Sequence, residues 1–339
     1  MQEEKQIYIK TTESCNICCK HCYIGDARKN RQFFDEKQTV VFLKKYIEEE
    51  QIPEEKILFS FHGGEPLICP LEKIQYVCDA FPLATFNTTT NLVYNLSDNL
   101  INLFKTIFNE KNNGQPFIKT SWDYKIRFLT DGMLDLWESN VKTLLSQGIY
   151  VQVIICLTSY LINEVSPLEL LEYFKNLGIQ SINFERLTPN TTNDKILIPD
   201  YKKQNDWLYE LCQLNDENKY VTIGMFEYIK SAINGTLIGC SKRRCMQDVL
   251  TINANGTIGG CPNTANCHCF GNIYSDIKEL NTSPCRLCLI QKEQIKDSRC
   301  FLCEMFNFCN GDCHQLEWQG DICPAPKSVM KYLANKYKK

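Results

Sequence analysis

The pattern of hydrophobic and polar positions predicts that strands and helices alternate over the first part of the chain. Segments rich in β-branched and aromatic residues predict strands at Gln6–Lys10, Ile57–Phe61, Ala84–Thr89, Phe117–Ser121, Tyr150–Leu157 and Ser181–Leu187. Amphipathic segments predict helices at about Asp35–Ile47, Leu71–Ala80, Asp98–Phe108, Leu134–Leu145, Pro167–Leu177 and Tyr201–Asn215. The helix before Gly178 is the best delimited, because Ser166 and Glu169 can form a capping box.

This alternation indicates parallel strands joined by crossover helices. The predicted units are fewer than the eight of a full barrel, so a doubly wound sheet and an incomplete barrel both remain open. In both architectures, ligands bind at the carboxyl ends of the strands. The final segment, Lys327–Lys339, predicts a short basic amphipathic helix that caps the fold.

Composition narrows the class of protein. The 339 residues carry a net charge of −3, which argues against a general electrostatic nucleic-acid binder. We find no apolar run long enough to cross a membrane, and the acidic, polar N-terminus is no secretory signal. We therefore expect a cytoplasmic protein with no nucleic-acid or membrane partner. In that reducing compartment, its 20 cysteines should be metal ligands or catalytic groups rather than disulfides.

Three cysteines follow the first predicted strand with metal-ligand spacing. Cys15, Cys19 and Cys22 form a C-x3-C-x2-C set. A tight loop with three thiolates can hold a [4Fe–4S] cluster and leave one iron open to a chelating molecule. Zinc also takes closely spaced thiolates, and the spacing alone leaves both alternatives open.

With the βα pattern behind it, this loop resembles that of the radical S-adenosylmethionine (SAM) superfamily, whose fold is a partial (β/α)6 barrel. His21 stands at the family's aromatic position, Phe61–Pro66 resembles its GGEP element, and Leu92 replaces the glycine of its T-N-G element. Ser121–Asp123 resembles its S-x-D element, and SINFERL its sixth strand. The resemblance covers about residues 6–190 and implies SAM contacts at Gly63, Gly64, Glu65, Pro66, Asn91, Ser121, Arg127 and Leu187. Taken singly, each of Asn91, Ser121 and Arg127 fits an ordinary structural role, such as a helix cap, equally well.

Twelve of the cysteines lie between Cys240 and Cys323, which indicates a separate metal-organised module. Their spacing, with Gly256 before Cys261, resembles the SPASM domain, and Asn253–Thr257 predicts its hairpin turn. The resemblance implies two auxiliary [4Fe–4S] clusters, the first held by Cys240, Cys245, Cys261 and Cys313, and the second by Cys300, Cys303, Cys309 and Cys323. A module with two zinc sites is the alternative.

The other nine cysteines fall into two groups. Within the module, Cys267, Cys269, Cys285 and Cys288 would be incidental thiols or an extra metal site, and we favour the first. Cys285 and Cys288 are expected on a helix before the second motif. The remainder are expected to be small core residues: Cys18, Cys69, Cys78, Cys156 and Cys212. Of these, Cys69 lies nearest the expected cofactor pocket.

The fold class expected is therefore α/β, with a partial radical SAM barrel and a small cysteine-rich SPASM domain. The expected domain bounds are 1–235 for the barrel, 236–326 for the SPASM domain and 327–339 for the C-terminal tail. The resemblance also implies an external low-potential electron donor of the flavodoxin or ferredoxin type. SAM would be cleaved to a 5′-deoxyadenosyl radical that abstracts hydrogen from the substrate.

Because SPASM enzymes mostly act on peptides, we expect oxidative modification of a ribosomally made peptide, by a carbon–carbon or thioether cross-link. A sulfatase-type maturase that forms formylglycine is one alternative, disfavoured because Pro262 follows Cys261 where those enzymes carry an Asp. A small-molecule dehydrogenase is another. A non-catalytic protein with structural metal or electron-transfer clusters is the last alternative, and it would need neither the GGEP element nor Ser121.

No general base is assigned from the sequence. Asp123 and Glu185 stand at predicted strand ends, and a helix cap or salt bridge is the preferred role of each. The first strand begins near residue 6, which leaves no room before it for the winged-helix domain that grips leader peptides in many maturases. Substrate recognition is therefore expected from a separate leader-binding protein, from barrel and SPASM surfaces, or from a short motif.

Overall fold

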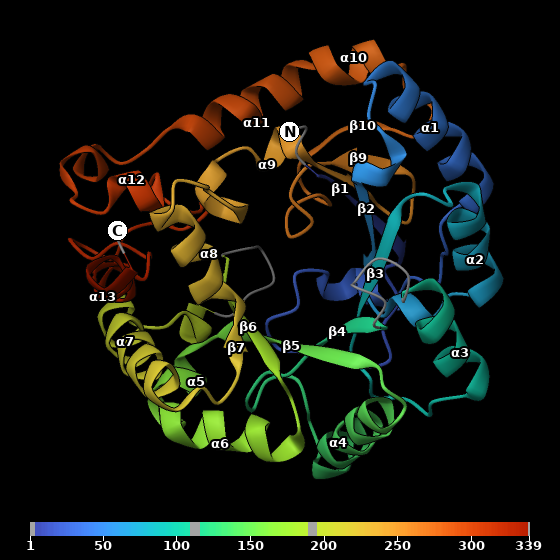
Figure 1. The fold of residues 1–339 in the computed structure, drawn as a ribbon. Coiled ribbons are helices and arrows are strands. Elements are labelled where there is room, and N and C mark those ends of the chain that lie inside the picture. Colours follow the sequence, from blue (N-terminus) through green and yellow to red (C-terminus); the bar gives the residue numbers. More distant parts are fainter. Residues whose placement is uncertain (1–3, 109–115, 189–194, 338–339) are drawn as a thin grey trace.

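A computed structural model describes residues 4–108, 116–188 and 195–337. Seven parallel strands stand side by side in chain order and curve into a partial barrel (Figure 1). They are β1 (Lys5–Thr12), β2 (Ile57–Gly63), β3 (Thr85–Thr90), β4 (Phe117–Ser121), β5 (Tyr150–Leu157), β6 (Ser181–Arg186) and β7 (Thr222–Ile223). Sequential strand order with helices on the outer face confirms the partial barrel and excludes the doubly wound sheet.

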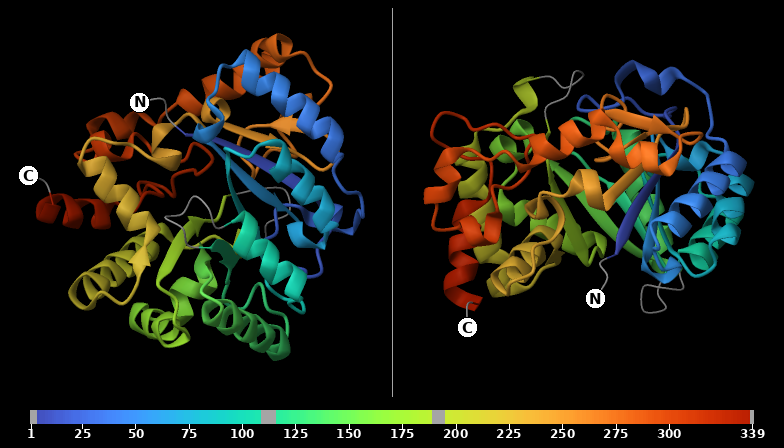
Figure 2. Two further views of the ribbon diagram at one scale, coloured as in Figure 1. Left: turned by 45° about the vertical axis from the view of Figure 1, so that its right-hand side comes forward. Right: turned by 90° about the horizontal axis from the view of Figure 1, so that it is seen from above.

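The cysteine-rich segment extends this sheet beyond β1. Strand β8 (Val249–Ile252) runs parallel to β1, and β9 (Thr257–Gly259) and β10 (Cys269–Asn272) follow antiparallel. In Figure 2, this orange segment lies beside the blue β1. The predicted hairpin turn joins β8 to β9, and Gly256 has the positive φ of +82° that such a turn requires. The same sheet thus joins the barrel to the cysteine-rich segment.

Helices cover the outer face of the barrel strands (Figures 1 and 2). They are α1 (Glu36–Glu49), α2 (Leu71–Ala80), α3 (Asp98–Ile107), α4 (Asp131–Ser146), α5 (Ser159–Glu164), α6 (Pro167–Leu177), α7 (Tyr201–Asn218) and α8 (Gly224–Ile233). The cysteine-rich segment contributes α9 (Cys245–Asp248), α10 (Ile277–Thr282), α11 (Pro284–Gln294) and α12 (Phe306–Cys309). The last helix, α13 (Lys327–Tyr337), packs against α7 and α8.

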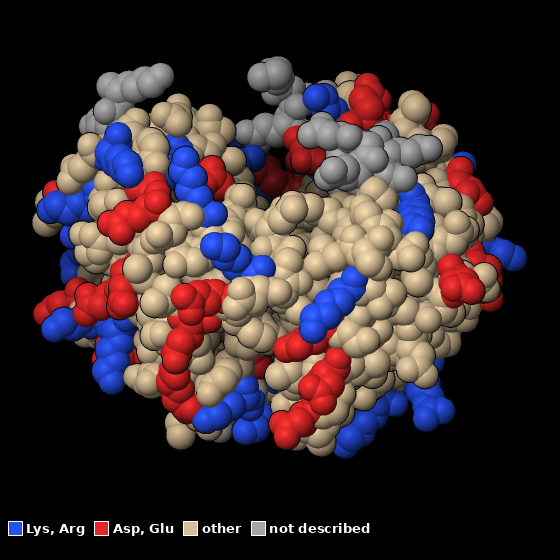
Figure 3. All heavy atoms as spheres, turned by 60° about the horizontal axis from the view of Figure 1, so that its bottom comes forward, with Lys and Arg blue, Asp and Glu red and all other residues tan. Residues whose placement is uncertain are grey.

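Short 3-10 helices complete the described chain at Gly25–Lys29, Glu54–Lys56, Pro66–Ile68, Lys195–Leu197, Gly239–Lys242 and Ser298–Leu302. The predicted capping box of α6 is present: Ser166 accepts from the backbone of Glu169, whose side chain accepts from Ser166 N–H. Gly178 ends that helix at φ 87°. No helix of the described residues is long and apolar enough to span a bilayer. Charges of both signs are interspersed on the face in Figure 3.

Successive side chains along each strand point alternately to the outer and the inner face of the barrel. In β1, Ile7 and Ile9 are fully buried in the apolar core, and Tyr8 and Lys10 alternate with them on the other side of the sheet. The aromatic ring of Tyr8 meets that of His62 from β2 edge-on, with centroids 5.7 Å apart. A full barrel would be filled by Val, Ile and Leu. This inner face is instead lined by polar side chains and leads to the carboxyl ends of the strands.

Candidate functional site

The cysteine loop between β1 and α1 brings Cys15, Cys19 and Cys22 together. The N–H of Cys22 donates to the carbonyl of Cys19 at 3.2 Å, which tightens the loop into a turn. Burial raises the pKa of Cys19 to about 12, and the charges of Cys22 and Cys15 add to this. Cys18 lies between these residues but is exposed, so its prediction as a core residue is wrong. Cys69, Cys78, Cys156 and Cys212 are buried as predicted.

Gly63 and Gly64 allow the end of β2 to pack against this loop. A Cβ on Gly64 would lie 2.0 Å from the carbonyl oxygen of Ser14, and one on Gly63 would lie 2.1 Å from that of Thr12. The N–H of Gly64 donates to Thr12, and that of Glu65 to Ser14, each at 2.8 Å. The glycines are therefore required for contact between the two loops, a role that the motif alone did not reveal.

The Glu65 carboxylate ties the GGEP loop to the end of β3. It is fully buried and accepts hydrogen bonds from Thr90 Oγ1 and Asn91 N, both at 2.7 Å, and from Leu67 N at 3.3 Å. Burial raises the pKa of Glu65 to about 7, against the opposing effect of these donors. Pro66 begins the 3-10 helix that follows and is itself buried.

Asn91 links β3 to the cysteine loop. Its Nδ2 donates to Asn16 Oδ1 at 2.7 Å and lies 3.7 Å from the sulfur of Cys15. The next residue, Leu92, has φ 52°, the left-handed conformation that favours glycine. The backbone shape of the T-N-G element is thus kept without its glycine.

At the end of β4, Asp123 is bound by several donors. It accepts from Arg127 Nε and from the N–H of Cys156, each at 2.7 Å, and lies 3.4 Å from His21 Nε2. Burial opposes its ionisation, but Arg127 and His21 hold the pKa of Asp123 below its usual value. The expected structural role of Asp123 is therefore confirmed. Together, His21, Asp123 and Cys156 present three potential ligand atoms within 4.8 Å of one another.

The remaining candidate contacts converge on the same end of the barrel. Although burial acts against it, the charges of Cys19 and Asp123 raise the pKa of Arg127, so this guanidinium lies near the cysteine loop. Ser121 pairs in register with Ile154 of β5. Leu187, after β6, is buried in a small apolar cluster that also contains Ile126, Cys156 and Leu197.

Glu185 faces the inner side of β6, and it has fewer polar contacts than Asp123. It accepts one hydrogen bond, from Asn183 Nδ2 at 3.2 Å, and no salt bridge within 4 Å is found for it among the described residues. Its side chain is exposed to solvent at the strand end, and the neighbouring protein and the charge of Cys240 raise the pKa of Glu185. The preferred cap or salt-bridge role is thus not seen for Glu185, which lies near the cysteine-rich segment.

The first proposed auxiliary set gathers around Cys240. Contacts with the sulfurs of Cys245 and Cys313 lower the pKa of Cys240. Burial, followed by the charge of Cys240, raises the pKa of Cys261 to about 11. These four cysteines come from β-hairpin, loop and short helical segments that are up to 73 residues apart in the chain.

The second proposed set gathers around Cys300. The N–H of Cys303 donates to the carbonyl of Cys300 at 3.1 Å. Burial raises the pKa of Cys300, and Cys323 and Cys303 add to the shift. Burial also raises the pKa of Cys309 to about 12, with Cys323 and Cys300 contributing. The division of these cysteines into two sets stays a prediction.

Both sets offer thiol sulfurs as their donor atoms, the ligands that zinc and iron–sulfur clusters take. In the first set, the sulfurs of Cys245 and Cys313 contact that of Cys240. The residues present therefore fit a metal centre held by thiolates.

The four additional cysteines of this segment form no compact ligand group in the described structure. Cys269 Sγ donates to the carbonyl of Ala265 at 2.9 Å, and Cys285 Sγ donates to that of Cys269 at 3.3 Å. Cys285 and Cys288 lie on α11, as predicted, and both are exposed, as is Cys267.

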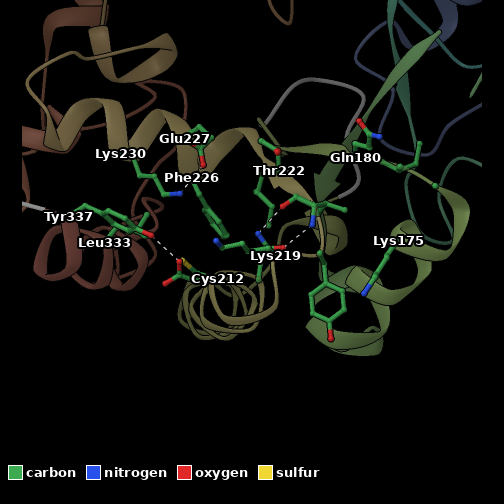
Figure 4. Close-up of a pocket in the computed structure, with 17 residues that line it drawn as sticks. Lys175, Gln180, Cys212, Lys219, Thr222, Phe226, Glu227, Lys230, Leu333 and Tyr337 are labelled. Carbon is green, nitrogen blue, oxygen red and sulfur yellow. Dashed lines mark hydrogen bonds and ion pairs between the residues drawn. The ribbon is translucent and has the colours of Figure 1, made fainter. Parts of the chain in front are cut away.

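A groove of about 560 Å³ lies away from the cysteine loop, among α6, α7, α8 and α13 (Figure 4). Its wall includes Asp216, which accepts hydrogen bonds from Tyr332 at 2.9 Å and Tyr337 at 3.0 Å. Lys230 lies over the ring of Tyr337, 5.2 Å from its centroid. None of the candidate cofactor or cluster residues lines this groove.

The partial barrel, extended by a cysteine-rich hairpin segment, is the fold of radical SAM proteins that carry a SPASM domain. The structure matches anSMEcpe with bound AdoMet at a TM-score of 0.78, with 16% identity over 98% of this chain and 96% of that one. It matches Streptococcus suis SuiB bound to the precursor peptide SuiA at 0.63, with 13% identity over 93% and 73%.

Comparison of the sequence with those of known proteins gives less specific matches than comparison of the structures. An uncharacterized protein of Methanocaldococcus jannaschii is 24% identical over 294 residues, which are 79% of this chain and 88% of that protein. No family model matches the chain. The recognition of the fold from the cysteine motifs is thus confirmed by the structural matches.

Proposed function

We propose that this protein is a radical SAM enzyme that oxidatively modifies a ribosomally made peptide. The observation that carries the proposal is the convergence of Cys15, Cys19 and Cys22 with the GGEP loop and Asn91 at the carboxyl end of the barrel. The proposed metal centre there is a [4Fe–4S] cluster with one open iron. When bound, this cluster supplies the electron that cleaves SAM to a 5′-deoxyadenosyl radical.

The chain's own residues would hold SAM beside this cluster. Backbone near Gly63, Gly64 and Pro66, with Glu65, is proposed to receive its amino group. The guanidinium of Arg127 is a suitable partner for its carboxylate, because Asp123 fixes it near the cysteine loop. Ser121 and Asn91 remain proposed polar contacts, and the buried backbone at Leu187 is the proposed adenine contact.

The two further cysteine sets are proposed to hold auxiliary [4Fe–4S] clusters. The first comprises Cys240, Cys245, Cys261 and Cys313, and the second Cys300, Cys303, Cys309 and Cys323. Their all-thiol donor sets, with Cys245 and Cys313 in contact with Cys240, support this assignment. A substrate radical that forms a cross-link must lose an electron and a proton. Glu185 is a suitable proton acceptor, since it is exposed on the inner face of β6 and accepts a hydrogen bond only from Asn183 among the described residues.

A peptide substrate is supported by the two structural relatives, both solved with bound peptides. The anSMEcpe protein was crystallised with the Cp18Cys peptide and SuiB with its precursor SuiA. The polar inner face of this barrel can satisfy the hydrogen bonds of an extended peptide backbone. We infer an external low-potential carrier of the flavodoxin or ferredoxin type as the source of electrons, and a separate leader-binding protein remains part of the proposal.

Anaerobic reconstitution tests the proposal. We expect about twelve irons per chain, from three four-iron clusters, and 5′-deoxyadenosine after addition of SAM and a strong reductant. Binding of zinc in place of iron, or intact SAM in the loaded protein, would contradict it. A candidate peptide encoded beside this gene should then lose two hydrogens on co-expression, as measured by mass spectrometry. An unchanged peptide mass would argue against the oxidative cross-link.

A further inference from the structure

One buried arginine beside the two proposed auxiliary cysteine sets has no carboxylate bound to it among the residues that the structure describes. Arg243 is 4% exposed and adopts φ 55° at the end of the 3-10 helix that carries Cys240. Its Nη1 donates to the carbonyls of Glu293 at 3.0 Å and Ile295 at 3.2 Å, and its Nη2 to that of Gly311 at 2.7 Å. Its Nε has no hydrogen-bond partner among the described residues.

These three carbonyls accept hydrogen bonds from Nη1 and Nη2 of Arg243 but leave its charge in place. A buried charge is costly unless an opposite charge compensates it. Burial lowers the pKa of Arg243, and the negative charges of Cys313, Cys300, Cys309 and Glu293 act in the opposite direction. The Glu293 carboxylate is itself bound by the N–H groups of Cys245 and Met246.

The chain position and hydrogen bonds of Arg243 place it beside both sets. It precedes Cys245 of the first set by two residues, and its Nη2 is bound to the carbonyl of Gly311, which lies between Cys309 and Cys313 in the chain. Cys313 belongs to the first set, whereas Cys300 and Cys309 belong to the second. A second arginine, Arg186 at the end of β6, also acts on both sets, but it forms an ion pair with Asp312. The charge of Arg186 is therefore offset by a bound carboxylate, whereas the hydrogen bonds of the Arg243 guanidinium go to backbone carbonyls.

We propose that Arg243 is a positioning residue whose fixed positive charge raises the reduction potential of both auxiliary clusters. This inference rests on the proposed [4Fe–4S] loading of these two sets. Each cluster with four thiolates is anionic and becomes more so when it gains an electron. A guanidinium held beside the clusters favours that added negative charge, more strongly in a buried site than in water. Acceptance of an electron from a substrate radical becomes easier at either cluster.

The test uses the full chain with Cys15, Cys19 and Cys22 replaced by Ala, so that only the auxiliary clusters load. Their midpoint potentials are measured by redox titration followed by electron paramagnetic resonance. Arg243→Gln keeps hydrogen-bond donors but removes the charge, and Arg243→Lys keeps the charge. Arg244→Gln is the matched control, because Arg244 is the next residue, is 55% exposed and pairs with Asp248.

We expect Arg243→Gln to reduce the equilibrium constant for reduction about tenfold at each cluster, a shift of about 59 mV for one electron. Arg243→Lys should retain most of the potential, and Arg244→Gln should change it little. Unchanged potentials in a fully loaded Arg243→Gln protein would overturn the proposal. If Arg243→Gln fails to bind iron, loading of Arg243→Lys supports charge compensation, and failure of both variants overturns it. Absence of iron in the parent protein would instead refute the proposed function.

Discussion

The buried pair of Asp123 and Arg127 should contribute strongly to stability, and Asp123→Asn tests this. The Oδ2–Nε distance is 2.7 Å, and the two side chains are 2% and 13% exposed. The substitution leaves a buried guanidinium facing an amide, and removal of one partner from a buried pair costs about 3–5 kcal/mol. Because Asn Oδ1 can still accept from Cys156 N–H, we expect the lower end, about 3 kcal/mol.

Thermal unfolding followed by circular dichroism provides the assay. A loss of about 3 kcal/mol lowers the midpoint temperature by about 4 °C for a chain of this length, from an unfolding entropy of about 2.1 cal/mol/K per residue. Asp26→Asn is the matched control, because Asp26 pairs with Lys29 at a similar distance of 3.2 Å but both side chains are largely exposed. An Asp123→Asn midpoint no lower than that of Asp26→Asn would refute the reasoning.

The double variant and the pH dependence sharpen this prediction. Arg127→Gln should partly restore the stability of Asp123→Asn, because no unpaired buried charge then remains. The folded pKa of Asp123 is lowered, so its stabilisation is present above the unfolded value of about 3.9 and is lost as the pH falls through the folded pKa. The difference between wild type and Asp123→Asn should therefore stay constant between pH 6 and 8.

Three further predictions concern the loop, the buried acid and a helix cap. Gly64→Ala should abolish iron loading at the cysteine loop, because its Cβ would meet the Ser14 carbonyl at 2.0 Å, whereas Gly132→Ala, with open space around it, should load normally in the same iron assay. Because burial raises the folded pKa of Glu65 to about 7, ionising it destabilises the folded state, and urea unfolding should show a loss of about 1 kcal/mol between pH 6 and 8. Glu65→Gln should remove this slope, and an equal slope in both proteins would contradict it. Ser166→Ala should lose about 1 kcal/mol in the same urea assay through the broken capping box, and an unchanged midpoint would exclude that contribution.

Much of the barrel could be predicted from local pattern. The bounds of β4, β5, α2 and α6 agree with their predictions to the residue, since alternation, caps and terminal turns are encoded nearby. Short elements such as α5 and β7 were missed because they carry too few periodic positions. The parallel pairing of β8 with β1 joins Val249 to Gln6, and no local signal in either segment specifies that partner.

The candidate site, like the fold, could be predicted from the sequence only where the signal is local. The spacing of Cys15, Cys19 and Cys22 indicated the metal loop, but spacing does not reveal which thiols face inward, and Cys18 proved exposed. Likewise, nothing in the sequence indicates that Arg243 lies beside two cysteine sets whose members are far apart in the chain. Such contacts depend on tertiary packing, which also pairs Asp123 with Arg127 and leaves Glu185 without a salt bridge among the described residues.

Formation of 5′-deoxyadenosine in a pair of single-cysteine variants tests the central claim most directly. Cys19→Ala removes a proposed cluster ligand, whereas Cys18→Ala removes the exposed thiol beside it. Both proteins are reconstituted anaerobically and incubated with SAM and a strong reductant, and the product is quantified by chromatography. The account predicts wild-type amounts from Cys18→Ala and none from Cys19→Ala. Equal formation by the two variants, or none by the wild type, would contradict it.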